Sequence, residues 1–176
     1  QYTFGELTAI LTKMLYRYTG EVKVPIGYYG RDMAILLNSA GKLKLPHLGL
    51  LFALNPSNQE SIKRILSLYD RYRITISEIM KKIFDLSTKI NNIILFDGRD
   101  IIFEELTSTI SSIIAHATKE PALIVVIGRS VGDYLKISIR ATKSLKIGNL
   151  GAILGNLSKK IPNTQAGGHE RAAGAY

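Results

Sequence analysis

The sequence predicts an α/β protein with a helical N-terminal part, a long connecting helix and a small α/β domain with a mixed sheet. Two observations lead to this prediction. Apolar residues keep a helical spacing through most of the first half of the chain. Further on, short apolar runs alternate with helical segments, as they do in α/β domains. We therefore expect three parts, at residues 1–55, 56–90 and 91–176.

Composition limits the class of protein. The chain has 176 residues, of which 46% are hydrophobic and 21% charged, which suits one folded domain with an appendage. It has no cysteine, so disulfides, thiolate metal sites and cysteine nucleophiles are excluded. No run of eighteen uncharged apolar residues occurs, so we expect no membrane span and no membrane partner.

The chain starts at Gln1, and its opening residues do not resemble a signal peptide. We expect the numbering to begin inside a longer gene product. The absence of cysteine favours an intracellular, cytoplasmic protein.

The N-terminal part is expected to be mainly helical. Residues 4–18 have apolar side chains at helical spacing, and Gly20 ends this segment. Residues 22–30 are expected to be extended, because Pro25 does not fit a helix interior. Residues 31–55 predict two short helices, joined by a turn at residues 39–41, with the second helix after Pro46.

The connecting helix is the clearest single element. Ser57 and Glu60 form an S-x-x-E capping box immediately before an apolar run. Apolar residues then keep a roughly helical period as far as Ile83, which predicts about eight turns. A helix of this length is expected to connect two parts of the protein that pack against it.

The remaining residues predict alternating strands and helices. Residues 121–128 form a nearly continuous apolar run, which favours a strand buried on both faces. Residues 133–142 alternate, with Lys136, Ser138 and Arg140 on one wet face. The other expected elements are a strand in residues 91–98 and helices in residues 106–118 and 148–161.

Positive charge is concentrated near the C-terminal end. The chain carries a net charge of +9, and residues 119–176 hold nine Lys and Arg residues and three acidic residues, a net charge of +6. Such a basic region fits a polyanionic partner. A solvated basic surface without a ligand is an equally good interpretation of the charge alone.

A Gly-Gly-His segment follows the last predicted helix. Gly167 and Gly168 precede His169, and the residues after it are expected to begin a short helix. Glycines that lead into a helix N-terminus form a site for anions, and His169 can donate a hydrogen bond to a phosphate. A plain turn, and an ordinary polar face around Ser138 and Arg140, are the alternatives.

Two motifs carry a resemblance to a known family. Ser138-Ile139-Arg140 and the complete GGHxxAAG motif at residues 167–174 resemble the DHH-associated domain of the DHH phosphoesterase superfamily. Residues 38–42 are similar to the N-A-A-G-R segment of RecJ-type members, with Ser for Ala and Lys for Arg. The segment order also agrees, and residues 1–55 would then be a remnant of the DHH-like part.

The resemblance implies nucleic-acid binding. In that family the GGH turn and the S-x-R arginine grip nucleotide phosphates, which nominates Arg140, Gly167, Gly168 and His169 here. Ser138 and Lys136, on the same expected strand face, complete the candidate set. The expected ligand is single-stranded DNA or RNA, bound through its backbone.

The metal cluster of the family's catalytic part is absent from this sequence. Two-metal hydrolysis needs several Asp and His side chains close together, including an Asp-His-His run. Here His47 is expected at a helix start, His116 within a helix, and Asp97 and Asp100 in a turn. We expect no metal, no cofactor and no catalytic residue in this chain, and hydrolysis only if a DHH domain lies upstream.

Three hypotheses follow. In the first, the chain is a non-catalytic RecJ-like protein of an archaeal replisome, which binds single-stranded DNA and, as part of a CMG helicase, GINS and MCM proteins near the nucleoid. In the second, it is the C-terminal, substrate-holding half of an active DHH-family exonuclease or oligonucleotide phosphatase. A C-terminal domain of an alanyl-tRNA synthetase is the third, and the RecJ-like segment at residues 38–42 disfavours it.

Overall fold

The computed structural model describes residues 30–130, 132 and 134–176. The helix expected at residues 4–18 and the extended segment that follows it lie outside the described residues. The chain divides into two compact units, Gln1–Ile74 and Thr75–Tyr176. Helix α4 (Gln59–Ile83) contributes residues to both units.

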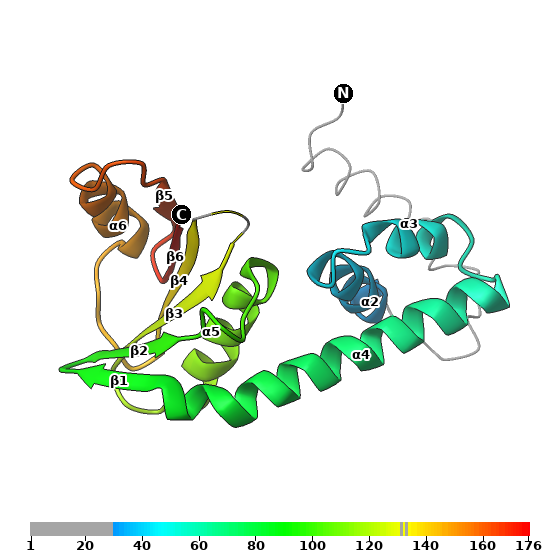
Figure 1. Cartoon of the computed structure of the whole chain (residues 1–176), viewed down its shortest axis with the longest axis horizontal. Helices are drawn as coiled ribbons and strands as arrows, with labels where there is room; N and C mark the ends of the chain where they lie inside the picture. Colours follow the sequence, from blue (N-terminus) through cyan, green and yellow to red (C-terminus); the bar gives the residue numbers. More distant parts are fainter. Residues whose placement is uncertain (1–29, 131, 133) are drawn as a thin grey trace. The chain divides into compact units, whose positions relative to one another are not determined.

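The described part of the first unit is helical, as expected. It contains α2 (Gly30–Lys42), α3 (Pro46–Leu54) and the first part of α4 (Figure 1). The core of this unit is formed by apolar side chains from all three helices: Met33, Leu36, Ala40, Phe52, Ile62, Ile65 and Leu68. Burial of such side chains is the main source of stability in this helical part of the unit.

The turn between α2 and α3 lies later than expected. Residues 39–41 belong to α2, and the chain turns at residues 43–45, where Lys44 has a φ of 60°. Ser39 fits inside the helix because its hydroxyl donates to the Leu36 carbonyl at 2.6 Å. Ala40 is fully buried in the core, which also favours continuation of the helix.

Helix α4 is shorter than the predicted connector. Its N-cap is Asn58, whose Oδ1 accepts from the Ser61 N–H at 2.9 Å, so the expected cap at Ser57 is wrong by one residue. The helix ends at Ile83, and residues 87–90, which we expected to be helical, form strand β1 (Ser87–Ile90). That segment is a strand because it pairs with β2 (Ile93–Asp97).

The second unit is built on a six-stranded sheet with the order β1-β2-β3-β4-β6-β5. Among these described strands, β2 and β3 are parallel and all other neighbours are antiparallel, so the sheet is mixed, as expected. The remaining strands are β3 (Leu123–Arg129), β4 (Leu135–Ala141), β5 (Ala166–Gly168) and β6 (Ala172–Ala175). The described residues thus confirm the α/β fold class.

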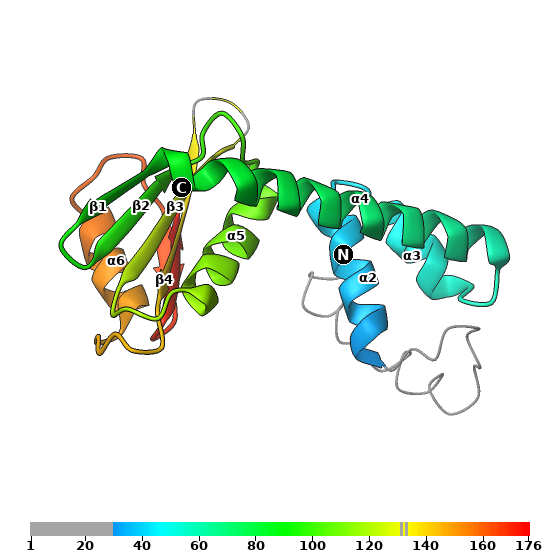
Figure 2. The ribbon, with the colours of Figure 1, turned by 90° about the horizontal axis from the view of Figure 1, so that it is seen from below.

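Two helices cover different parts of this sheet. Figure 2 shows α5 (Glu104–Ala117) on one side of the sheet and α6 (Leu150–Ser158) on the other. On β3, Ile124 and Val126 are fully buried, whereas Val125 and Ile127 are half-buried. The expectation that this strand is buried on both faces is therefore wrong.

None of the helices in the described part of the chain is long and apolar enough to cross a membrane.

Candidate nucleic-acid interface

The Gly-Gly-His segment forms a β-hairpin and not the start of a helix. Gly167 and Gly168 belong to β5, and the residues after the turn form β6. The hairpin is closed by the His169 N–H, which donates to the Ala172 carbonyl at 2.7 Å. The expected helix after His169 is wrong because residues 172–175 extend the sheet by pairing with β4.

The hairpin turn also occupies the N-terminus of α6. The Leu150 N–H donates to the Glu170 carbonyl and the Gly151 N–H to the His169 carbonyl, both at 3.0 Å. The Ala152 N–H is capped by the side chain of Asn149. These donors stabilise the fold, and none of these three N–H groups remains for an anion. The anion site predicted at a helix beginning at His169 is wrong together with that helix, because residues 172–175 form a strand.

The two glycines of the motif have different surroundings. A Cβ atom on Gly168 would lie 2.5 Å from the Cα of Ala173, and one on Gly151 would lie 2.5 Å from the Gly168 carbonyl carbon. Folding therefore requires glycine at position 168. Gly167 is exposed, and a Cβ there would meet no heavy atom within 4 Å. Gly167 is thus the glycine that leaves room for an outside group to approach the backbone.

The strand register brings the candidate residues to one face of the sheet. Ser138 lies opposite Gly174, and Gly174 lies opposite Gly167. Arg140 lies opposite Ala172. Since side chains alternate along a strand, Lys136, Ser138 and Arg140 share their face with Gly167, Ala172 and Gly174. We call these last three residues the glycine strip; none has a side chain larger than a methyl group.

Ser138 is not on a wet face, contrary to our expectation. Its side chain is buried beneath α5, with 3% of the residue exposed, and its Oγ lies 2.9 Å from the Oγ of Ser111. This pair satisfies both hydroxyl groups inside the core. Ser138 therefore joins α5 to β4, and its hydroxyl is not directed at a ligand.

Two arginines near the glycine strip differ in their bonding. Arg140 is half-buried, and its Nε is a buried donor without a hydrogen-bond partner among the described residues. The side chain of Arg171 donates to the carbonyl groups of Thr142 and Leu145. Arg171 thus holds the loop after β4, whereas the Nε of Arg140 makes no such bond within the described residues.

Lys136 lies at the other end of the strip. Its Nζ is 3.3 Å from the ring centroid of Tyr176, a cation–π contact that holds the ammonium group over the sheet. Lys136 and Arg140 are four residues apart on one strand, which corresponds to about 13 Å. The sequence motifs did not place Tyr176 in the site, although its position opposite Lys136 follows once β6 is recognised as a strand.

The other titratable candidates do not form a metal site. His47 and His116 are exposed on different helices, and the Asp97 carboxylate is held by Arg99, with an Nη2–Oδ2 distance of 2.6 Å. The hydrogen bond from Arg99 lowers the pKa of Asp97. No group of three or more His, Cys, Asp or Glu side chains able to hold a metal ion occurs in the part of the chain that the structure describes.

Solved structures with the same fold are RecJ and DHH-domain proteins. A crystal structure of RecJ from Thermus thermophilus with Mn²⁺ is similar to 95% of this chain, with a TM-score of 0.64 and 19% identity. The same RecJ with Mg²⁺ gives a TM-score of 0.63 and 19% identity over 92% of the chain. The DHH domain of a member of the S1p family of ribosomal proteins has a TM-score of 0.54 and 13% sequence identity over 83% of this chain. The match covers 37% of that protein's chain.

This chain spans about a quarter of RecJ, 26% and 25% of the two structures. No protein-family model and no curated protein matches the sequence. The resemblance seen in the motifs is thus supported at the level of a RecJ-like fold.

Proposed function

We propose that the chain binds single-stranded nucleic acid through its phosphates, along the glycine strip. The observation that carries this proposal is the buried Nε of Arg140, which lacks a partner among the described residues although the polar groups beside it, such as the hydroxyl of Ser138, are satisfied. An unpaired buried donor is costly, so the Arg140 side chain gains when it turns outward to a phosphate oxygen that accepts from its guanidinium group.

The glycine strip suits a phosphate backbone. Gly167 leaves its backbone accessible, Arg140 and Lys136 supply two positive charges on the same face, and His169 lies exposed at the turn near Arg140. The separation of about 13 Å between Lys136 and Arg140 exceeds one nucleotide step, so the strip fits a strand with several phosphates. Contacts of this kind read the backbone and not the base sequence.

Within this proposal, we favour a non-catalytic RecJ-like scaffold of the replication machinery, with single-stranded DNA and GINS- and MCM-type proteins as partners, in an archaeal cell. Support comes from the RecJ-like fold, the motif at residues 38–42 and the lack of a metal cluster in the described residues.

The alternative is the substrate-binding half of a DHH-family exonuclease or oligonucleotide phosphatase. It is favoured by one observation, namely that the chain spans about a quarter of RecJ. The rest of a longer protein would then supply the metal ions.

One assay separates the two functions. Single strands labelled at the 5′ or the 3′ end are incubated with the full-length gene product and Mn²⁺, and both binding and cleavage are measured. Binding without cleavage supports the scaffold, and cleavage supports the alternative. If neither occurs, the proposed nucleic-acid function is wrong.

A further inference from the structure

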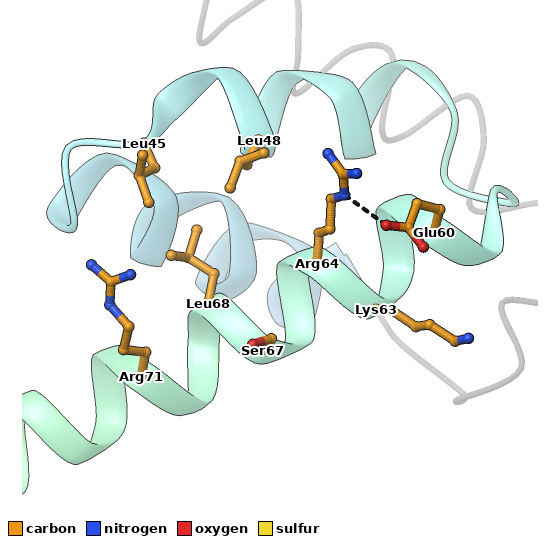
Figure 3. Close-up of a pocket in the computed structure, with 8 residues that line it drawn as sticks. All are labelled: Leu45, Leu48, Glu60, Lys63, Arg64, Ser67, Leu68 and Arg71. Atoms are coloured by element: carbon orange, nitrogen blue, oxygen red, sulfur yellow. Dashed lines mark hydrogen bonds and ion pairs between the residues drawn. The ribbon is translucent and has the colours of Figure 1, made fainter.

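A pocket in the first unit, between α3 and the first part of α4, has its contacts made by its own residues (Figure 3). Leu68 belongs to the core of that unit and is only 5% exposed. The Nε of Arg64 donates to Glu60 at 2.8 Å, which satisfies this guanidinium group inside the chain. We therefore assign no ligand to this pocket.

The phosphate contacts of the glycine strip do not by themselves select a single strand. Arg140, Lys136 and the backbone at Gly167 would contact phosphates, and a duplex carries phosphates as well. What distinguishes a single strand is that its bases can leave their neighbours and stack on an aromatic side chain. A selective site therefore needs an exposed aromatic ring beside the strip.

Tyr176 is such a residue. It follows β6 and lies opposite Lys136, because Ala175 pairs with Ile137 in the antiparallel ladder. Its N–H donates to the Gln165 carbonyl at 2.9 Å, and its carbonyl accepts from the Gln165 N–H at 3.1 Å. Tyr176 is nevertheless 48% exposed. An anchored backbone thus presents an exposed ring on the same face of the sheet as the glycine strip.

Lys136 connects this ring to the glycine strip. Its Nζ lies 3.3 Å from the centroid of the Tyr176 ring, and a Cβ atom on Gly174 would lie 3.6 Å from the same Nζ. The lysine side chain therefore passes close to Gly174 and ends over one face of the ring. Because the ammonium group covers that face, the exposed area of the ring belongs to its other face and its edge.

We propose that Tyr176 stacks on a base of the bound strand and thereby makes the glycine strip selective for single-stranded nucleic acid. This inference rests on the proposed function, because Arg140 and Lys136 would hold phosphates of the same strand. Tyr176 lies beside Lys136, about 13 Å along the sheet from Arg140, which leaves room for more than one nucleotide between them. Stacking accepts every base, so we expect no sequence preference.

The test measures fluorescence anisotropy of three labelled ligands of equal length with the full chain. They are a single strand of thymidines, the same strand without its bases, and a duplex. We expect the single strand to bind roughly tenfold more tightly than the abasic strand, as the loss of one stacked base predicts. The duplex should also bind more weakly than the single strand, because its bases are not available.

Two substitutions at Tyr176 assign the effect to its ring. Tyr176→Ala should weaken binding of the single strand by roughly tenfold and leave the abasic strand unaffected. Tyr176→Phe should bind as the wild type does, because the ring is retained. Neither substitution removes a phosphate contact, so the slope of log affinity against log salt should not change.

Phe103→Ala is the matched control. Phe103 is 52% exposed, and the Cζ of Arg129 lies 5.2 Å from its ring centroid, so it is also an exposed ring beside a cation. Arg129 pairs with Leu135, which neighbours Lys136 on β4, so this pair lies on the opposite face of the sheet. Binding of all three ligands should be unchanged in this variant. Circular dichroism confirms that each variant is folded.

The outcomes separate this inference from the proposed function. If Tyr176→Ala binds the single strand as tightly as the wild type while Arg140→Ala binds it more weakly, stacking at Tyr176 is wrong and the phosphate site stands. Equal binding of the single strand and the abasic strand by the wild type would also overturn the inference. If the wild type binds none of the three ligands, the proposed function is wrong, and this inference with it.

Discussion

One face of the sheet has two regions, one under α5 and one beside α5, and their polar groups differ in hydrogen bonding. Under α5, the Ser138 hydroxyl is paired with that of Ser111. At the end of β4, Thr142 accepts from the Ala122 N–H and donates to the Glu120 carbonyl, each at 2.9 Å. Beside α5, over β6 and β5, the glycine strip bears no large side chain, and the Nε of Arg140 is unpaired among the described residues.

This difference separates polar groups that serve folding from the Nε of Arg140, which the packing of the described residues leaves without a partner. Polar groups inside a fold are normally satisfied, so a satisfied group is explained by stability alone. A buried donor that stays unpaired needs another explanation, and the phosphate that we propose as ligand is one. Substitutions of groups that are paired or packed within the fold should therefore lower stability, whereas substitutions at the glycine strip should affect binding.

The largest effect is expected at Gly168. A Cβ there would overlap the backbone of β6, which cannot move without loss of the hairpin. Gly168→Ala should lower the free energy of unfolding by about 3 kcal/mol. Urea unfolding measures this change, and a variant as stable as the wild type would show that the close packing at Gly168 is not present in solution.

A smaller loss of stability is expected for Arg171→Ala. The substitution removes the donors to the carbonyl groups of Thr142 and Leu145, which should cost about 1–2 kcal/mol in the free energy of unfolding. Arg140→Ala is the comparison, and by the same measurement it should be as stable as the wild type or more so. Equal losses in both variants would remove the distinction between these arginines.

Gly167→Ala should affect binding and not stability. The Cβ points into open space, so the free energy of unfolding should change by less than about 0.5 kcal/mol. If a phosphate lies against the backbone here, the added methyl group should keep it away, and affinity for a single strand should fall roughly fivefold. Unchanged affinity in a filter-binding assay would place the ligand away from β5.

The smallest effect concerns pH. Because the pKa of Asp97 is lower in the folded protein than in the unfolded chain, its ion pair with Arg99 stabilises the fold above the ordinary Asp pKa. That contribution is lost as the pH falls through the folded-state value. Asp97→Asn should therefore weaken the dependence of unfolding on acid pH, and an unchanged pH profile would indicate that the pair is broken in solution.

Much of the fold could be predicted from the sequence because the patterns are local. The helical period of α4 and the alternation in β4 follow from neighbouring residues. Strand β1 and the hairpin at Gly167 could not be predicted in this way. Residues 87–90 and 172–175 become strands through pairing with partners elsewhere in the sequence, and tertiary pairing overrides local preference.

The candidate site was predicted in part. The motif led to Arg140, Gly167 and His169, which remain candidates. The burial of Ser138 could not be foreseen, because its partner Ser111 lies on a helix 27 residues earlier. The opposite roles of Gly167 and Gly168 also depend on the packing of β6 and α6, which sequence spacing does not reveal.

The most direct test of the phosphate-binding strip is the salt dependence of single-strand binding for Arg140→Ala, with Lys159→Ala as the control. Lys159 is an exposed residue at the end of α6. Loss of one phosphate contact should reduce the slope of log affinity against log salt by about 0.7 and weaken binding. We expect this change in Arg140→Ala and not in the control. Identical slopes and affinities for wild type and Arg140→Ala would contradict the central claim that Arg140 holds a phosphate.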